Sequence, residues 1–255
     1  MLKIPYTTPT KGLLNELGLW SIENEIIYRK LMFLHKLING DTLSSKIFSE
    51  QCELPGPTWA KQTIDLISEL EMGEDIDCNK IKDMPKDEWR RRVLHAINGR
   101  VQDQFEEFKN NSVKCKNIKY NLKELSDYLE KMKPKEAKVI LLARLGMTNI
   151  KCNFPNQYER KLTCELCGEQ DENLVHLLNC KQNKLTDGET EYSDSVITNI
   201  YKNDDLEFLT NTANDILIKI NNRDKKVKVQ NNSDGTLTRF LETEGSTLSE
   251  RRSTE

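Results

Sequence analysis

The feature that most restricts how this chain can fold is a short run of metal-ligand residues. Three cysteines and one histidine follow the pattern Cys-x2-Cys-x8-His-x3-Cys, at Cys164, Cys167, His176 and Cys180. Zinc binds four such ligands tetrahedrally, and a Cys-x2-Cys turn can offer two sulfurs to one ion. His176 and Cys180 are four residues apart, so a helix would project both from one face. Gly168 supplies a residue for the tight turn. The spacing predicts a zinc module with these four residues as its metal ligands.

The predicted zinc ion is structural rather than catalytic. All four positions are filled by protein side chains, which leaves no open position for water or substrate. Cys152 is a spare thiol whose spacing fits the pattern less well. The loop itself contains four acidic residues and no lysine, arginine or aromatic residue. Zinc knuckles that grip single-stranded nucleic acid usually combine basic residues with a stacking aromatic. A folding role is therefore at least as well supported as a binding surface.

Composition limits both the size of the core and the cellular compartment. Apolar residues make up 36% of the 255 residues and charged residues 31%, against about 45–50% and about 25% in average globular proteins. The formal net charge of −3 gives no overall basic field for nucleic acid. The seven cysteines are odd in number and mostly scattered, and no apolar run reaches the length of a signal core or a membrane span. We expect a reducing, cytoplasmic or nuclear location and no membrane contact.

Apolar residues recur at helical spacing through most of the chain. The clearest case runs from Ser21, the expected N-cap, to Gly40. His35 lies in this helix and is interpreted as a packing residue. We expect the other helices at 11–17, at two sites within 41–70, and at 87–110, 122–132, 136–145 and 195–220. The predicted fold is all-α: an irregular helical bundle with a small Cys3His zinc module and a disordered C-terminal tail.

The same pattern predicts four segments. A helical connector domain covers 1–150, the zinc module 151–184 and a helical extension 185–220. From 221 to 255 the composition is Asn, Lys, Ser, Thr, Glu and Gly, which is typical of disorder.

Two sets of basic residues are candidates for nucleic-acid contacts. One set lies on the predicted helix 87–110, and the other flanks the zinc module. A solvated helix face and a phosphate-binding face both remain open for the first set. The candidate residues are Arg90, Arg91, Arg92, Arg160, Lys161 and Lys181.

Several stretches resemble one family when they are taken in order. They are Ile4-Pro5 with Thr8-Pro9-Thr10, Glu16 to Leu19, Tyr28 to His35, Trp89 with its arginines, Ala137 to Met147, Lys151-x-Asn153-Phe154, and the zinc motif. Together they are similar to the region beyond the polymerase in non-LTR retrotransposon reverse transcriptases. There, a helical connector is followed by a Cys-Cys-His-Cys motif. The resemblance covers roughly residues 1–182, and the last ligand gap is three residues where the family often has four.

The resemblance implies a non-catalytic C-terminal piece of a reverse transcriptase. The Tyr-x-Asp-Asp motif of the polymerase is absent from the sequence, so we expect no enzyme activity. The implied partners are RNA or DNA and the upstream reverse transcriptase domain. The alternative is a helical protein-interaction domain stapled by zinc that binds no nucleic acid. A cryptic nuclease is a remote third interpretation.

Overall fold

The computed structural model describes residues 4–73, 78–115, 117–121, 124–159, 161–184, 192–193, 198–201 and 205–233. Within these ranges the chain is helical, with one isolated antiparallel bridge between Thr163 and Asp171 and no strand. The predicted all-α fold is therefore confirmed. The contacts divide the chain into two compact units. The first contains 1–147 with 198–209, and the second contains 148–197 with 210–255.

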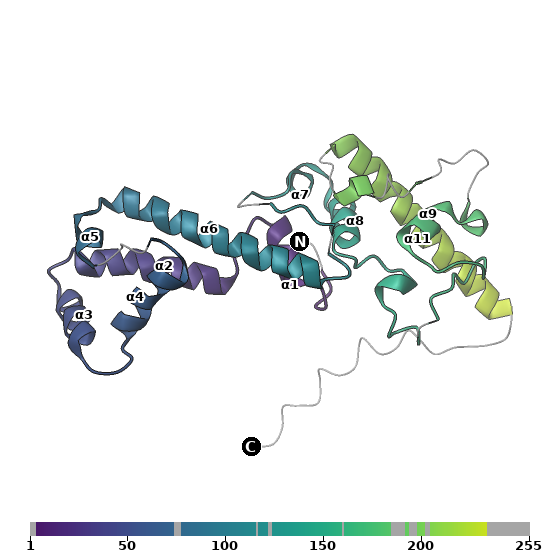
Figure 1. Cartoon of the computed structure of the whole chain (residues 1–255). Helices are drawn as coiled ribbons and strands as arrows, with labels where there is room; N and C mark the ends of the chain where they lie inside the picture. Colours follow the sequence, from purple (N-terminus) through teal and green to yellow (C-terminus); the bar gives the residue numbers. More distant parts are fainter. Residues whose placement is uncertain are drawn as a thin grey trace, which may run out of the picture. The chain divides into compact units, whose positions relative to one another are not determined.

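The helices are labelled in Figure 1. Their bounds are α1 Thr10–Glu16, α2 Ile22–Ile38, α3 Leu43–Glu53, α4 Trp59–Glu69, α5 Cys78–Asp83, α6 Lys86–Asn111, α7 Asp127–Lys131, α8 Pro134–Arg144, η1 Lys151–Asn153, α9 Leu174–Asn179, η2 Lys181–Asn183 and α11 Leu206–Ser233.

The core of the first unit lies between α2 and α6, which run side by side (Figure 1). Helices α3, α4 and α5 pack around α2. Fully buried side chains step along the facing sides of the two long helices, as the helical spacing predicts. The Trp89 indole N–H donates to the carbonyl oxygen of Leu31 at 2.9 Å, so the largest core residue also has its polar atom satisfied. His35 is buried beside Trp89 and its Nε2 is 2.9 Å from the Met84 carbonyl oxygen. His35 is thus a packing residue, as expected.

Local signals in the sequence set the ends of the first two helices. The Ser21 side chain accepts a hydrogen bond from the Asn24 backbone N–H, which makes Ser21 the predicted N-cap of α2. Gly18 ends α1 with a φ of 62°, a conformation that a side chain disfavours. An added Cβ at Gly18 would also lie 2.5 Å from the Glu124 backbone. Two separate constraints, the positive φ and the lack of space for a Cβ atom, therefore require glycine at this position.

A buried polar network joins α1 to α8 within the first unit. One carboxylate oxygen of Glu16 accepts hydrogen bonds from Ser126 Oγ, Tyr128 Oη and Arg144 Nη1, at 3.0, 2.8 and 3.2 Å. The Arg144 guanidinium lies 4.6 Å from the Tyr128 ring centroid, and its Nε donates to the Ile200 carbonyl oxygen. Because the Ser126 backbone N–H also donates to Glu16, the chain is tied to α1 immediately before α7. Helix α7 accordingly starts at Asp127, whereas we expected a helix over 122–132.

Helix α11 corrects the prediction for the C-terminal part. It was expected to end at Ile220 and to be followed by a disordered tail over 221–255, but it continues to Ser233. Two polar side chains near the start of this segment bind other parts of the second unit. Asn222 donates to Asn183, and Arg223 pairs with Glu172. Residues 234–255 lie outside the described residues.

The boundaries of the units also differ from the predicted segments. The expected division near residue 150 falls close to the observed one after Met147. However, most of α11 belongs with the zinc-motif region instead of forming a separate extension over 185–220. Hydrogen bonds between Lys219 and Asn183 join them, and these polar pairs have no periodicity that a sequence would reveal.

Candidate metal centre

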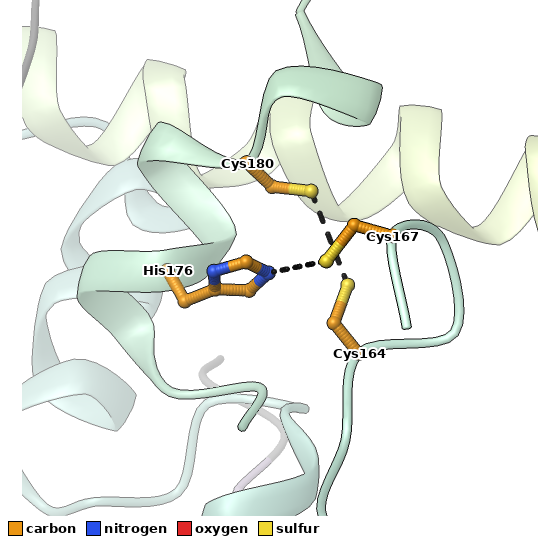
Figure 2. A group of neighbouring side chains, drawn as sticks. All are labelled: Cys164, Cys167, His176 and Cys180. Carbon is orange, nitrogen blue, oxygen red and sulfur yellow. Dashed lines mark hydrogen bonds between the residues drawn. The ribbon is translucent and has the colours of Figure 1, made fainter. Parts of the chain in front are cut away.

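The four predicted metal ligands come from two local structures in the second unit. Cys164 and Cys167 lie on a tight turn, and His176 and Cys180 lie on and just after α9 (Figure 2). The turn is closed by the Gly168 backbone N–H, which donates to the Cys164 carbonyl oxygen at 2.9 Å. Gly168 has a φ of 69°, so the glycine predicted for this turn is the residue that its backbone needs.

Helix α9 sets the other two ligands on one face. The Asn173 side chain caps it by accepting from the His176 backbone N–H at 2.8 Å. The Cys180 backbone N–H donates to the His176 carbonyl oxygen at 2.7 Å, which is the i to i−4 bond of an α-helix. The buried side chains of Leu174, Leu177 and Leu178 anchor this short helix.

The four ligand atoms converge on one point. They all lie within 4.8 Å of one another. The Cys164 and Cys180 sulfurs are 4.0 Å apart, and the Cys167 sulfur is 3.4 Å from His176 Nε2. A tetrahedral ion with bonds of about 2.3 Å to sulfur would hold two sulfurs roughly 3.8 Å apart. The separations therefore fit a single metal ion bound by all four residues.

A neighbouring amide fixes the histidine ring. His176 Nδ1 lies 3.0 Å from Gln170 Oε1, on the side of the ring away from the sulfurs. An amide oxygen only accepts, so this contact places the proton on Nδ1 and leaves the lone pair of Nε2 for a metal. The sequence did not identify Gln170 as a partner of His176, because no known ligand pattern places a glutamine at this spacing from a metal-binding histidine.

Two of the three clustered cysteines have shifted pKa values, and their environments differ. Burial, and then the neighbouring Cys164, raise the pKa of the Cys180 thiol to about 11. At Cys167 burial also raises the pKa, but hydrogen bonds from the backbone N–H groups of Glu169 and Gln170, and then from the Cys164 and Cys180 side chains, together lower the net pKa. A bound divalent cation would offset the cost of charging the thiols, because a coordinated thiol is deprotonated. Cation binding at this site should therefore strengthen as pH rises.

A buried ion pair fastens the metal-ligand region to α11. Arg223 Nη1 lies 2.6 Å from Glu172 Oε1, and both side chains are at least nine-tenths buried. The same nitrogen donates to the Asn149 carbonyl oxygen at 2.8 Å. The Glu172 backbone N–H donates to the Leu162 carbonyl oxygen, and the Glu172 carbonyl oxygen accepts from the Cys152 backbone N–H, so Glu172 is also bound to the segment that precedes the cysteine turn. Glu172 was counted among the acidic residues of the loop, but it is an internal anchor.

Cys152 is not one of the four clustered ligands. Burial, and then the carboxylates of Asp171 and Glu172, raise the pKa of its thiol. This environment favours the protonated thiol over the thiolate that a metal ligand needs.

The candidate nucleic-acid residues are divided between the two units. Arg90, Arg91 and Arg92 are exposed on α6 in the first unit, but three consecutive helical residues point in different directions. Arg92 also pairs with Glu88 at 3.0 Å. Lys161 and Lys181 are exposed in the second unit, and Arg160 lies outside the described residues.

A search of the described helices finds none with the length and apolar character needed to cross a membrane. No protein-family model matches the chain, and no curated protein or solved structure is significantly similar to it.

Proposed function

We propose that Cys164, Cys167, His176 and Cys180 bind one structural zinc ion that completes the fold of the second unit. The convergence of the four ligand atoms within 4.8 Å carries this proposal. Three thiolates and an imidazole suit zinc, which accepts tetrahedral sulfur and nitrogen ligands. Zinc would replace the missing apolar core of the cysteine turn, whose residues outside Cys164 are mostly exposed or half-buried.

A metal titration tests the ligand set. The purified chain should contain one zinc ion per molecule, and cobalt should replace it with the visible absorption of tetrahedral sulfur coordination. Cys164→Ser should weaken binding strongly, whereas Cys152→Ser should leave it unchanged because Cys152 is outside the cluster. Full zinc content in Cys164→Ser would rule out this ligand set.

We further propose that the zinc-stabilised chain is a non-catalytic nucleic-acid-binding region of a retrotransposon-type reverse transcriptase. The order of motifs supports this reading, as do the exposed cations on both units. Arg90 and Arg91 on α6 and Lys161 and Lys181 beside the metal ligands are all accessible to phosphate. Since the net charge is −3, any binding must come from such local sites.

Salt dependence tests this second proposal. Binding of labelled single-stranded RNA, single-stranded DNA and duplex DNA should weaken steeply with salt, and each lost phosphate contact should reduce the slope by about 0.7 to 0.9. Lys161→Glu with Lys181→Glu, and separately Arg90→Glu with Arg91→Glu, should weaken binding. Two reversals at Lys46 and Lys36, away from these residues in sequence, control for net charge. Equal losses in the control variant would argue against specific cationic contacts.

A protein-interaction domain is the second candidate function. Exposed apolar side chains on the first unit favour it: Ile22 and Leu43 are 71% and 75% exposed. Such a contact would be largely indifferent to salt and to the charge reversals, because apolar burial does not depend on phosphate neutralisation. Retained partner binding at high salt would favour this function over the first.

A further inference from the structure

The first unit contains a cavity that none of the functions above uses. Its volume is about 100 Å³, and it lies between α1, the start of α2 and α6. Three aromatic rings, Trp20, Phe105 and Tyr120, contribute to its wall. The centroids of Phe105 and Tyr120 are 5.3 Å apart. Aromatic walls of this kind favour a flat, apolar occupant.

Two of the residues that line this cavity each have a side-chain oxygen that lacks a hydrogen-bond partner among the described residues. These oxygens are Asn24 Oδ1 and Tyr120 Oη, and both atoms are buried. The Asn24 residue is only 1% exposed. Its Nδ2 donates to Ser21 Oγ and Gln104 Oε1, both at 3.0 Å, so the orientation of the amide is fixed. Buried polar atoms normally have a partner, because leaving one unpaired costs free energy.

We propose that this cavity binds a small planar ring that carries an N–H or O–H donor, with the donor directed at Asn24 Oδ1. The ring would pack against the aromatic wall, and a second polar atom on the ring would meet Tyr120 Oη. An apolar cavity of about 150 Å³ in another protein takes up benzene, so a cavity of this size class suits a single ring. Larger substituents could extend past exposed Lys11 and Glu23.

The Tyr120 hydroxyl can either donate or accept a hydrogen bond at neutral pH. Burial, and then the nearby Asp103, raise the pKa of its hydroxyl, so it stays protonated. A protonated hydroxyl both donates and accepts. Asn24 Oδ1 only accepts, and this asymmetry selects rings that bear at least one donor.

Two sources could supply such a ring: a free heteroaromatic compound, or an unpaired base in a nucleic-acid strand. Stacking of an unstacked base on aromatic side chains is a common mode of single-strand recognition. The cavity belongs to the first unit, whereas the zinc ligands belong to the second. The proposal therefore does not depend on zinc or on the cationic residues.

The test uses the full chain with cytosine as the donor-bearing ring and benzene as the apolar ring. Binding is followed by the indole N–H signal of Trp20 in a ¹H–¹⁵N spectrum, with Trp59 and Trp89 as internal references. Cytosine should shift the Trp20 signal in a saturable way. Tyr120→Phe should weaken cytosine about fivefold to tenfold, since one hydrogen bond is lost, and leave benzene unchanged. Its thermal stability should not fall, because an unpaired buried hydroxyl is removed.

The matched control is Tyr6→Phe, because Tyr6 is fully exposed and does not line the cavity. It should leave cytosine binding unchanged. Val101→Phe, which fills the cavity from α6, should abolish the Trp20 shift with both rings. A single-stranded oligodeoxycytidine that competes with cytosine would identify a strand base as the source, and absence of competition would identify a free compound. Failure of cytosine to bind, or equal losses for cytosine and benzene in Tyr120→Phe, would overturn the proposal.

Discussion

The interiors of the two units are stabilised by different kinds of contact. In the first unit, α2 and α6 bury Leu31, Trp89, Ile97 and their apolar neighbours completely. In the second, three cysteines and a histidine converge, and an Arg223–Glu172 ion pair and the Asn183 amide connect the metal-ligand region to α11. Apolar residues also contribute there, through α9 and Ile216 of α11. Several polar contacts also join distant segments in the second unit.

This difference shows how a chain with only 36% apolar residues can stabilise two units. Apolar burial is cumulative and tolerates changes in detail. Metal ligation and buried ion pairs instead depend on every partner being present, since a remaining partner is left unsatisfied. The apolar core between α2 and α6 should therefore lose stability gradually on mutation, whereas the metal-ligand cluster and the Arg223–Glu172 pair should lose it in large steps.

Removal of the metal should produce the largest difference in stability between the two units. With zinc bound as proposed, a chelator should unfold the cysteine turn and expose α9, because metal affinity is also folding free energy. In zinc-finger peptides this affinity amounts to about 10–16 kcal/mol at pH 7. Amide hydrogen exchange should show protection lost in residues 161–184 and kept in α2 and α6.

Addition of excess zinc after chelation should restore protection in the turn, whereas magnesium should not, because it prefers oxygen ligands. Equal loss of protection in α2 and α6 would show that the units are not energetically separate.

Breaking the buried ion pair should have the next largest effect. Arg223→Met leaves the Glu172 carboxylate buried without its partner, which should cost about 3–5 kcal/mol of unfolding free energy in the second unit. Lys228→Met is the matched control, because Lys228 is an exposed cation on the same helix. The measurement is denaturant unfolding with zinc present. If both variants lose the same small amount, the ion pair contributes no more than a surface charge.

A mutation that creates a cavity in the apolar core should instead destabilise the first unit. Ile97→Ala on α6 should cost about 2–5 kcal/mol in the first unit, through lost burial and the space left behind. Zinc content and protection of the cysteine turn should stay unchanged. Ile47→Ala is the control, because Ile47 is 46% exposed and its truncation should cost little. A drop in zinc affinity in Ile97→Ala would show coupling between the units.

Both units contain features that the sequence predicted. Helical spacing predicted α2, α4, α6 and α8, because apolar burial repeats with the period of the helix. The cluster of Cys164, Cys167, His176 and Cys180 was also predictable, since ligand chemistry and spacing are written locally in the sequence. Both signals depend only on residues that lie near one another in the chain.

The contacts that the sequence did not reveal join residues far apart in it. Arg223 and Glu172 are both polar, and a polar composition predicted disorder over 221–255, yet Arg223 is buried within α11. Glu16 was likewise ordinary in the sequence, but it is the acceptor for Ser126, Tyr128 and Arg144. A charged residue carries no sign of its distant partner, so composition cannot separate an anchored polar segment from a solvated one.

The smallest predicted effect concerns a single hydrogen bond in the second unit. The Tyr192 hydroxyl donates to the Asp215 carboxylate on α11. Burial first, and then this bond to Asp215, raise the pKa of Tyr192 well above its usual range. Tyr192→Phe should cost about 1.5–3 kcal/mol at neutral pH, as for a hydrogen bond to a charged group.

The pH dependence of this bond gives a second readout. A raised folded-state pKa means that the native state holds the phenolic proton more tightly than the unfolded state. The contribution of Tyr192 is therefore complete below pH of about 10, the unfolded value, and declines as pH rises above it. The stability gap between wild type and Tyr192→Phe should narrow in alkaline solution, as measured by urea unfolding from pH 7 to 11. A gap that stays constant across this range would mean that the stabilisation comes from ring packing, and the proton on Tyr192 would then play no part in holding α11 to the second unit.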